Sequence, residues 1–249
     1  MSQHFHRLIE DSLHGLIVLY RQPILKLGVD STEDKISHYE ILSRFSYQGE
    51  LQSPANWVKS FEEHDLCYLL DRHVIKLLSE YLKKTGDTTV YSVNVSGQTI
   101  NQNGLFVDHV VSCNLPSTTI FECTESVVIE LCHLMDSACS LIAIESLRHL
   151  SKEFTLAIDD FGIGAFRLAH LDSIKPKFVK IDGSFARAME NSETAQSDIA
   201  AISQIAHARG CEVCLEWVET KAQLELARKI GIDYVQGFAV AKPELLTVL

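Results

Sequence analysis

Residues 154–182 read FTLAIDDFGIGAFRLAHLDSIKPKFVKID, and this stretch decides the fold. It contains two short apolar runs, Phe154–Ile158 and Phe178–Ile181, which have the length and composition of buried strands. Both runs are followed directly by acidic residues, and the second also contains Lys180. A charged side chain in a buried strand is costly unless it is paired or bound to a metal ion. The stretch therefore predicts strands that carry chemistry at their carboxyl ends.

Six further apolar runs of this kind occur along the chain, and segments with helical periodicity lie between most of them. The runs are Gly15–Tyr20, His38–Phe45, Thr89–Val95, Thr119–Cys123, Cys211–Leu215 and Asp233–Val235. Helices are expected over Asp65–Lys84, Thr194–Arg209 and Thr220–Ile230, and once or twice within Glu125–Leu150. Eight strands separated by helices predict one TIM-like (β/α)8 barrel domain over residues 15–249, preceded by an N-terminal extension or leading helix over residues 1–14.

The composition narrows the range of partners. The 249 residues include 33 acidic and 22 basic residues, which gives a formal net charge of −11. Because duplex nucleic acid and anionic lipids are bound by basic surfaces, we expect neither duplex nucleic acid nor membrane contact. The seven cysteines follow no disulfide framework, which predicts a reducing cytoplasm. A small anionic ligand would require a local reversal of charge, which a bound metal ion supplies.

Polar side chains end nearly every apolar run. Those within or just after the runs are Glu40, Asn94, Glu122, Asp159, Asp160, Lys180, Asp182, Glu216, Glu219 and Gln236. In a (β/α)8 barrel the carboxyl ends of the strands meet at one mouth, so these side chains are expected to converge there. Any single one could be an exposed loop residue or a paired core ion. The same pattern on six or seven strands favours a functional site.

The residue types indicate the chemistry of that site. Hard oxygen ligands typical of Mg²⁺ or Mn²⁺ sites are offered by Glu40, Asn94, Glu122, Asp159, Asp160 and Glu216. Five carboxylates exceed the needs of one divalent ion, and two adjacent ions stabilise the attacking and leaving oxygens of phosphoryl displacement. Lys180 either pairs with a carboxylate or orients a water and stabilises phosphate charge. Neighbouring carboxylates keep a lysine charged, which argues against a simple general-base role.

These residues lie in motifs that resemble the EAL-domain family of cyclic di-GMP phosphodiesterases, from about Tyr20 to Pro243. The motifs are Gln22-Pro23, Glu40-Ile41-Leu42-Ser43-Arg44, Val93-Asn94-Val95-Ser96, Glu122-Cys123-Thr124-Glu125, Asp159-Asp160-Phe161-Gly162, Lys180-Ile181-Asp182, Glu216-Trp217-Val218-Glu219-Thr220, Gln236-Gly237 and Pro243. The resemblance implies a barrel whose first strand runs antiparallel to the others. It also implies a bacterial, cytoplasmic signalling enzyme that hydrolyses cyclic di-GMP to linear pGpG. Such an enzyme uses Mg²⁺ or Mn²⁺, is inhibited by Ca²⁺ and forms a homodimer.

The resemblance also implies roles for single residues. Two metal ions would be held by Glu40, Asn94, Glu122, Asp159, Asp160 and Glu216, and catalysis would involve Glu40, Asp160, Lys180 and Glu216. Substrate contacts would come from Gln22, Leu42, Arg44, Asp182, Glu219, Gln236 and Pro243. The guanidinium of Arg44 suits this role because it can bind a phosphate through two hydrogen bonds. Glu125 would support the loop after its strand.

Two departures from the family pattern leave a second hypothesis open. Trp217 stands where the family has glycine, and alternation along a strand would point its side chain away from that of Glu216. The stretch 163–168 lacks the family's small hydroxyl residues and tyrosine, in a loop that couples metal binding to dimerisation. The chain could then be a weakly active, partner-dependent or inactive module that acts as a cyclic di-GMP receptor or regulates a protein. An enolase-like barrel enzyme fits the carboxylates but not the Glu-x-Leu-x-Arg motif.

Overall fold

A computed structural model of the chain describes residues 13, 15–52, 54–101, 105–124, 138–163 and 168–247. Of the expected N-terminal extension it describes only Leu13, which is buried. Glu125 and residues 164–167 of the altered loop lie outside the described residues. The boundaries expected for the extension and the domain therefore stay predictions.

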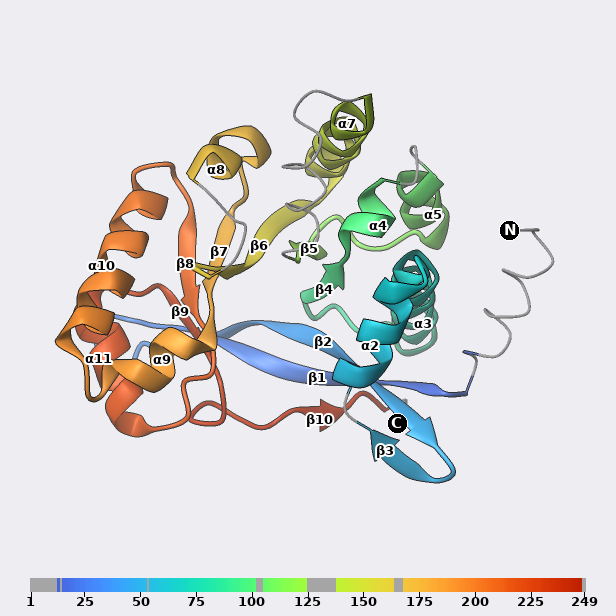
Figure 1. Cartoon of the computed structure of the whole chain (residues 1–249). Coiled ribbons are helices and arrows are strands. Elements are labelled where there is room, and N and C mark those ends of the chain that lie inside the picture. The colour runs from blue at the N-terminus through green and yellow to red at the C-terminus, as the bar shows by residue number, and fades with distance from the viewer. Residues whose placement is uncertain are drawn as a thin grey trace.

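The strands form a closed barrel (Figure 1). Their bounds are β1 Ile17–Lys26, β2 Lys35–Tyr47, β3 Glu50–Gln52, β4 Tyr91–Val95, β5 Ile120–Cys123, β6 Thr155–Phe161, β7 Phe178–Ile181, β8 Glu212–Leu215, β9 Tyr234–Gln236 and β10 Glu244–Leu245. Strands β2 and β4 to β9 pair in parallel, and β1 closes the barrel by pairing antiparallel with both β2 and β9. The eight-stranded barrel and its antiparallel first strand are thus confirmed. The apolar pattern did not predict β3, which pairs antiparallel with β2, or β10, which pairs antiparallel with β1.

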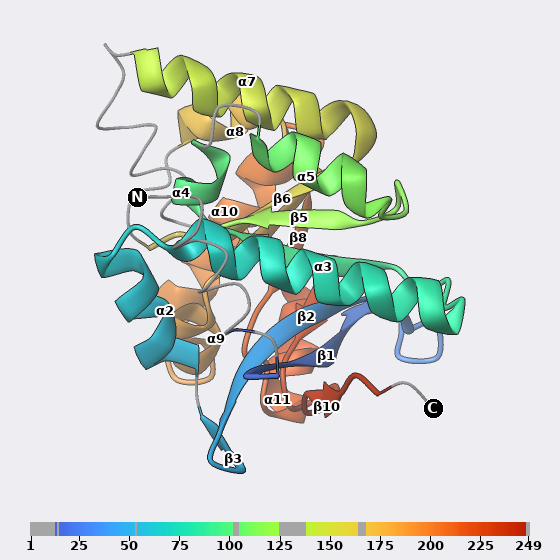
Figure 2. The same ribbon diagram turned by 90° about the vertical axis from the view of Figure 1, so that its right-hand side faces the viewer.

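Helices surround the barrel, with α9, α10 and α11 on one side and α2 to α5 on the other (Figure 1). Their bounds are α2 Pro54–Glu63, α3 Cys67–Thr85, α4 Gly97–Ile100, α5 Leu105–Cys113, α7 Ala138–Glu153, α8 Leu168–Ile174, α9 Gly183–Met189, α10 Glu193–His207 and α11 Lys221–Ile230. The long helix α3 packs against β1 and β4 from outside (Figure 2). In the described part of the chain, no helix has the length and apolar character needed to cross a membrane.

Local sequence explains where α11 begins and ends. The hydroxyl of Thr220 accepts a hydrogen bond from the backbone N–H of Gln223, and the Gln223 side chain accepts one from the backbone N–H of Thr220. This reciprocal pair is a capping box, which satisfies two N–H groups at the start of the helix. Gly231 ends the helix in the left-handed conformation, which glycine adopts without steric cost.

Strands β1 and β6 are among those that extend beyond the apolar runs that predicted them. Strand β1 continues to Lys26, although Pro23 lacks the N–H that a ladder uses, because its pairing with β2 persists across Pro23. Strand β6 continues past Ile158 to Phe161, and its register with β7 shifts between these residues. An irregularity of this kind changes the direction in which the next side chains point. The polar end of β6 therefore belongs to the barrel mouth, whereas Lys26 at the end of the antiparallel β1 pairs with Lys35 and Tyr234 at the amino ends of β2 and β9.

Candidate metal and catalytic site

The inner layer of the barrel determines where the polar strand ends lie. A small cluster of buried side chains is formed by Ile24, Ile120, Ala157, Phe178, Cys214 and Tyr234. Side chains two residues apart on a strand point to the same face. Two positions further along the five parallel strands stand Glu122, Asp159, Lys180, Glu216 and Gln236. On the antiparallel strand β1 the order is reversed, and Gln22 comes two residues before Ile24.

Lys180 lies at the centre of these side chains. Its Nζ atom is 2.6 Å from Glu122 Oε2 and 2.7 Å from Glu216 Oε1. It is also 3.0 Å from Asp159 Oδ1 and 3.2 Å from Glu40 Oε2. The Lys180 side chain is only 3% exposed, so all four contacts form away from bulk water. One ammonium group therefore faces four carboxylates, which leaves an excess of negative charge in a buried place.

Amide side chains hold Glu40 from two further directions. Asn94 Nδ2 donates to Glu40 Oε1 at 2.8 Å, and Gln236 Nε2 donates to Glu40 Oε2 at 2.7 Å. Gln22 accepts a second hydrogen bond from Gln236 at 3.2 Å and donates to the carbonyl of Ala241 at 3.0 Å. Asn94 of β4, Lys180 of β7 and Gln236 of β9 thus hold the carboxylate of Glu40 in one orientation.

Asp160 joins the site because the backbone turns there. Neighbouring residues on a regular strand point to opposite faces. Asp160 instead has a φ of 53° at the irregular end of β6, a left-handed conformation in which aspartate is enriched. One carboxylate oxygen each of Asp159, Asp160 and Glu216 lies within 4.8 Å of the others. Three oxygen donors at this separation are suited to a divalent cation.

The surroundings shift the pKa values of the carboxyl groups in different directions. Burial, together with the charge of Glu40, raises the pKa of Glu122 to about 8. Burial and the nearby Asp159 raise the pKa of Asp160 to about 7, and burial raises that of Glu216 well above its usual range. Burial acts the same way on Glu40, but Lys180 and two amide hydrogen bonds hold the pKa of Glu40 below its usual value.

The electrostatics and hydrogen bonding fit a bound cation. Burial first, and the neighbouring carboxylates second, raise the pKa values of Glu122 and Asp160, and a divalent ion would favour the ionised form of both groups. Within the described part of the chain, no donor reaches the buried Oδ1 atom of Asn94. A buried acceptor without a partner is costly. A hard cation is a partner that such an oxygen and the neighbouring carboxylates can share.

A cleft of about 490 Å³ opens over this cluster. Six of the seven expected substrate contacts line it, namely Gln22, Leu42, Arg44, Glu219, Gln236 and Pro243. Asp182 does not line the cleft, because its carboxylate caps α9 by accepting a hydrogen bond from Ser184 N at 2.8 Å. The charge of Asp182 still acts on the site, because it helps to raise the pKa of Asp160.

Sequence reasoning missed other residues of the cleft wall. Pro54, Gly237 and Phe238 line it, and so does Trp217. Trp217 lies on the cleft side and not where the alternation of a regular strand would place it, because its φ of 54° interrupts the alternation that follows β8. Gly237 could have been found, because a glycine directly after a strand indicates a turn. Pro54 could not, because it begins helix α2, which follows none of the strands whose polar ends form the site.

Gly237→Ala is expected to destabilise the domain by about 1–3 kcal/mol, because the added Cβ would both strain the backbone and meet the backbone of Val218. Gly237 has a φ of 153°, and a Cβ atom there would overlap the backbone of Val218. Urea unfolding measures the loss. Gly210→Ala is the matched control, since φ is 75° but no described atom lies within 4 Å of its added Cβ. Equal losses in both variants would contradict a role for the close approach at Gly237.

Comparison with known proteins supplies the family. The family model described as "EAL domain" matches residues 7–243. The chain is 28% identical over 240 residues to cyclic di-GMP phosphodiesterase PdeB of Shewanella oneidensis, covering 92% of this chain and 27% of PdeB. It is 28% identical to the probable cyclic di-GMP phosphodiesterase PdeA of Escherichia coli, covering 93% of this chain and 31% of PdeA. The chain therefore spans about a third or less of the length of these relatives.

Solved structures agree with the fold. The PaMucR phosphodiesterase in its c-di-GMP complex superposes with a TM-score of 0.78 at 24% identity, over 97% of both chains. The FimX EAL domain from Pseudomonas aeruginosa, bound to c-di-GMP, gives a TM-score of 0.77 at 23% identity, over 98% of this chain and 97% of FimX. Because the family model spans nearly all of the sequence and its strand-end motifs meet at one barrel mouth, the chain belongs to the EAL domain family.

Proposed function

We propose that this domain is a metal-dependent phosphodiesterase that hydrolyses cyclic di-GMP to linear pGpG. The observation that carries the proposal is the buried lysine ringed by four carboxylates at the barrel mouth. The relatives named as cyclic di-GMP phosphodiesterases support the choice of substrate. An anionic ligand can approach so acidic a site only when cations balance its charge, which agrees with metal dependence.

The donor set fits Mg²⁺ or Mn²⁺, and we infer two ions. Asp159, Asp160 and Glu216 would supply the oxygen donors on one side of the site. Glu40, Asn94 and Glu122 would supply the remaining oxygen donors. Bound divalent ions neutralise phosphate charge and lower the pKa of a coordinated water. Mg²⁺ and Mn²⁺ prefer these hard oxygens, and the set contains no thiolate or imidazole.

The protein's own groups have separate tasks. Lys180 Nζ keeps its positive charge, because the surrounding carboxylates raise its pKa well above the usual range despite burial. It therefore orients the carboxylates and stabilises negative charge on the phosphate, and it is no base. Arg44 lines the cleft, and its guanidinium donates to the Ser43 carbonyl at 2.8 Å. It would bind the second of the two phosphates of cyclic di-GMP. Gln236 donates to Glu40 and to Gln22, and both glutamines border the same cleft.

Metal binding is expected to strengthen as the pH rises from 6 to 8. Carboxyl groups bind a cation in their ionised form, and the pKa values of Asp160 (about 7) and Glu122 (about 8) leave protons on them at low pH. A cation must displace those protons, so the apparent affinity gains about tenfold per pH unit for each proton displaced. Calorimetry with Mn²⁺ at pH 6.0, 7.0 and 8.0, in two buffers of different ionisation enthalpy, measures both the affinity and the protons released. An affinity independent of pH would contradict the assignment.

Incubation of the pure domain with cyclic di-GMP and either Mg²⁺ or Mn²⁺ tests the function, with the products separated by chromatography. We expect pGpG, none in the presence of a chelator, and inhibition by added Ca²⁺. Binding of cyclic di-GMP without turnover would favour the receptor that the altered loop leaves open. Absence of binding would favour a module that regulates a protein partner. A homodimer and a cytoplasmic location stay predictions from the resemblance.

A further inference from the structure

Trp217 is an exposed aromatic residue at the edge of the site. It directly follows Glu216, lines the same cleft as Asp160, and is 55% exposed. Its φ of 54° is in the left-handed region, which is strained for a bulky side chain. An indole in this position gains little from core packing, and glycine would adopt the backbone conformation without strain. A strained residue at a cleft is a reason to look for a functional contact.

The neighbouring helix holds the indole in one orientation. A Cβ atom on Gly183, the first residue of α9, would overlap the Cβ and Cγ atoms of Trp217. Arg187 lies one helical turn further along α9, and its Cζ atom is 4.5 Å from the centre of the Trp217 ring. A guanidinium stacked on an indole is attracted by the negative face of the ring. The ring is thus placed before any ligand arrives.

A second aromatic ring with a nearby cation borders the same cleft. Phe238 is 53% exposed, and Lys242 Nζ is 5.4 Å from the centre of its ring. The cleft therefore combines an acidic floor, suited to metal ions and phosphate, with exposed aromatic rings. A ligand that satisfies both parts has an anionic group and a flat aromatic ring in one molecule.

We propose that the indole of Trp217 is a stacking surface for a nucleobase of the ligand, and that Gly183 and Arg187 position it. This inference rests on the proposed function, because cyclic di-GMP supplies two purine rings and two phosphates. Removing an aromatic side chain on which a base stacks weakens binding of the ligand by about 5- to 100-fold. Trp217 is then a specificity-determining residue, and Arg187 is a positioning residue that acts through it.

Tryptophan fluorescence reports the contact directly. The chain has two tryptophans, and the other, Trp57, stacks on Phe45 at 4.8 Å and donates from Nε1 to Gln52 at 2.8 Å. Trp57→Phe leaves Trp217 as the sole indole. In this variant, with Ca²⁺ present to prevent turnover, we expect cyclic di-GMP and GMP to quench the fluorescence. Ribose 5-phosphate, which has no base, should leave it unchanged.

Calorimetry on matched variants then measures the energetic effect. Trp217→Ala should weaken cyclic di-GMP binding about 5- to 100-fold and leave ribose 5-phosphate binding unchanged, whereas Trp217→Phe should stay within about threefold of the parent. Gly183→Ala should also weaken cyclic di-GMP binding, because its added Cβ displaces the Trp217 ring without removing it. Circular dichroism checks that each variant is folded.

The outcomes separate this inference from the proposed function. Equal cyclic di-GMP affinity in the parent and Trp217→Ala, without quenching, would overturn the stacking role and leave the phosphodiesterase proposal standing. A parent domain that does not bind cyclic di-GMP would overturn both. Quenching by ribose 5-phosphate as strong as that by GMP would also contradict the inference, because it would assign the contact to the phosphate.

Discussion

Lys180→Met is expected to destabilise the metal-free domain by about 3–5 kcal/mol, the usual cost of breaking a buried ion pair by removing one partner. Four carboxylates, from Glu40, Glu122, Asp159 and Glu216, would lose their shared positive charge in a place from which water is excluded. A divalent cation brings two positive charges to the same groups. Excess Mg²⁺ or Mn²⁺ is therefore expected to restore part of the stability, and the variant should depend more on metal than the parent does. Urea unfolding with a chelator and with added metal measures both effects.

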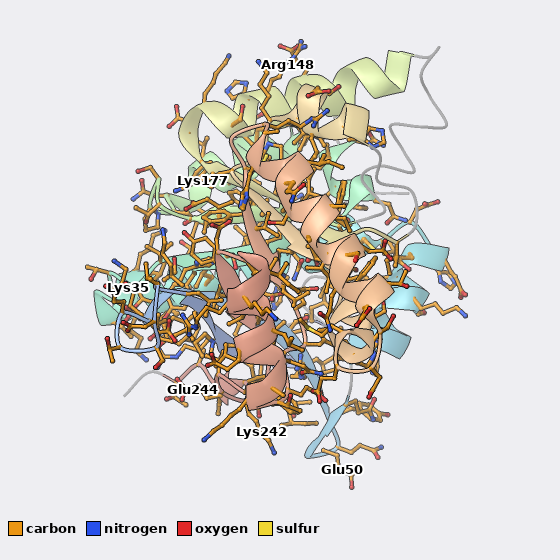
Figure 3. The ribbon with its side chains drawn as sticks, turned by 90° about the vertical axis from the view of Figure 1, so that its left-hand side faces the viewer. Lys35, Glu50, Arg148, Lys177, Lys242 and Glu244 are labelled. Atoms are coloured by element: carbon orange, nitrogen blue, oxygen red, sulfur yellow. The ribbon has the colours of Figure 1, made fainter. Side chains whose placement is uncertain are left out.

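Lys177→Met is the matched control for this experiment. Lys177, which is labelled in Figure 3, precedes strand β7 by one residue and is 59% exposed. Its nearest acidic partner is Glu212, at 3.8 Å, and exposed pairs of this kind contribute about 0–1 kcal/mol. A loss of stability in Lys180→Met no larger than that in Lys177→Met, or one that metal does not reduce, would refute the charge balance described for the barrel mouth.

Glu40→Gln is expected to lower the rate of cyclic di-GMP hydrolysis by at least about 100-fold while the fold persists. The substitution keeps the volume of the side chain but replaces one of two carboxylate oxygens by an amide that donates hydrogen bonds. That amide would face a donor, either Asn94 Nδ2 or Gln236 Nε2, because both now donate to Glu40. It would also remove a charge from the proposed metal site. Rates of pGpG formation at saturating metal measure the effect, and calorimetry with Mn²⁺ measures metal affinity.

Glu225→Gln removes the same charge from a position outside the site. Glu225 is 66% exposed, and its contact with Arg228 is 3.8 Å long. Its rate should equal that of the parent. If Glu40→Gln hydrolyses cyclic di-GMP at the rate of the Glu225→Gln control, the proposed role of Glu40 in the mechanism is wrong.

The convergence of the polar strand ends could be predicted because it follows from strand geometry. Residues such as Glu122, Lys180 and Gln236 occupy the same face as an apolar residue two positions away, and a barrel brings these faces together. The sequence pattern therefore located the barrel mouth and its charged groups. The reversal of β1, which brings Gln22 to the same place, came only from the family resemblance, since an apolar run does not reveal its direction.

Features that depend on single backbone angles could not be predicted from periodicity. Asp160 and Trp217 both break the alternation of strands with a left-handed φ, and each thereby faces the cleft beside a neighbour that also faces it. Asp182 also depends on its surroundings: it follows β7 as a site residue would, and its carboxylate caps α9. Which of these occurs depends on contacts with other elements, such as the approach of Trp217 to Gly183.

Anomalous diffraction at the manganese edge, from crystals of the domain grown with Mn²⁺, tests most directly whether the barrel mouth is a metal centre. Peaks are expected beside the carboxylates of Asp159, Asp160 and Glu216, with Glu40 and Asn94 among the oxygen donors around them. Lys180 should keep its position next to Glu122. A map without a peak at the barrel mouth, at a Mn²⁺ concentration that supports hydrolysis in solution, would contradict the assignment of these residues as the metal-dependent catalytic site.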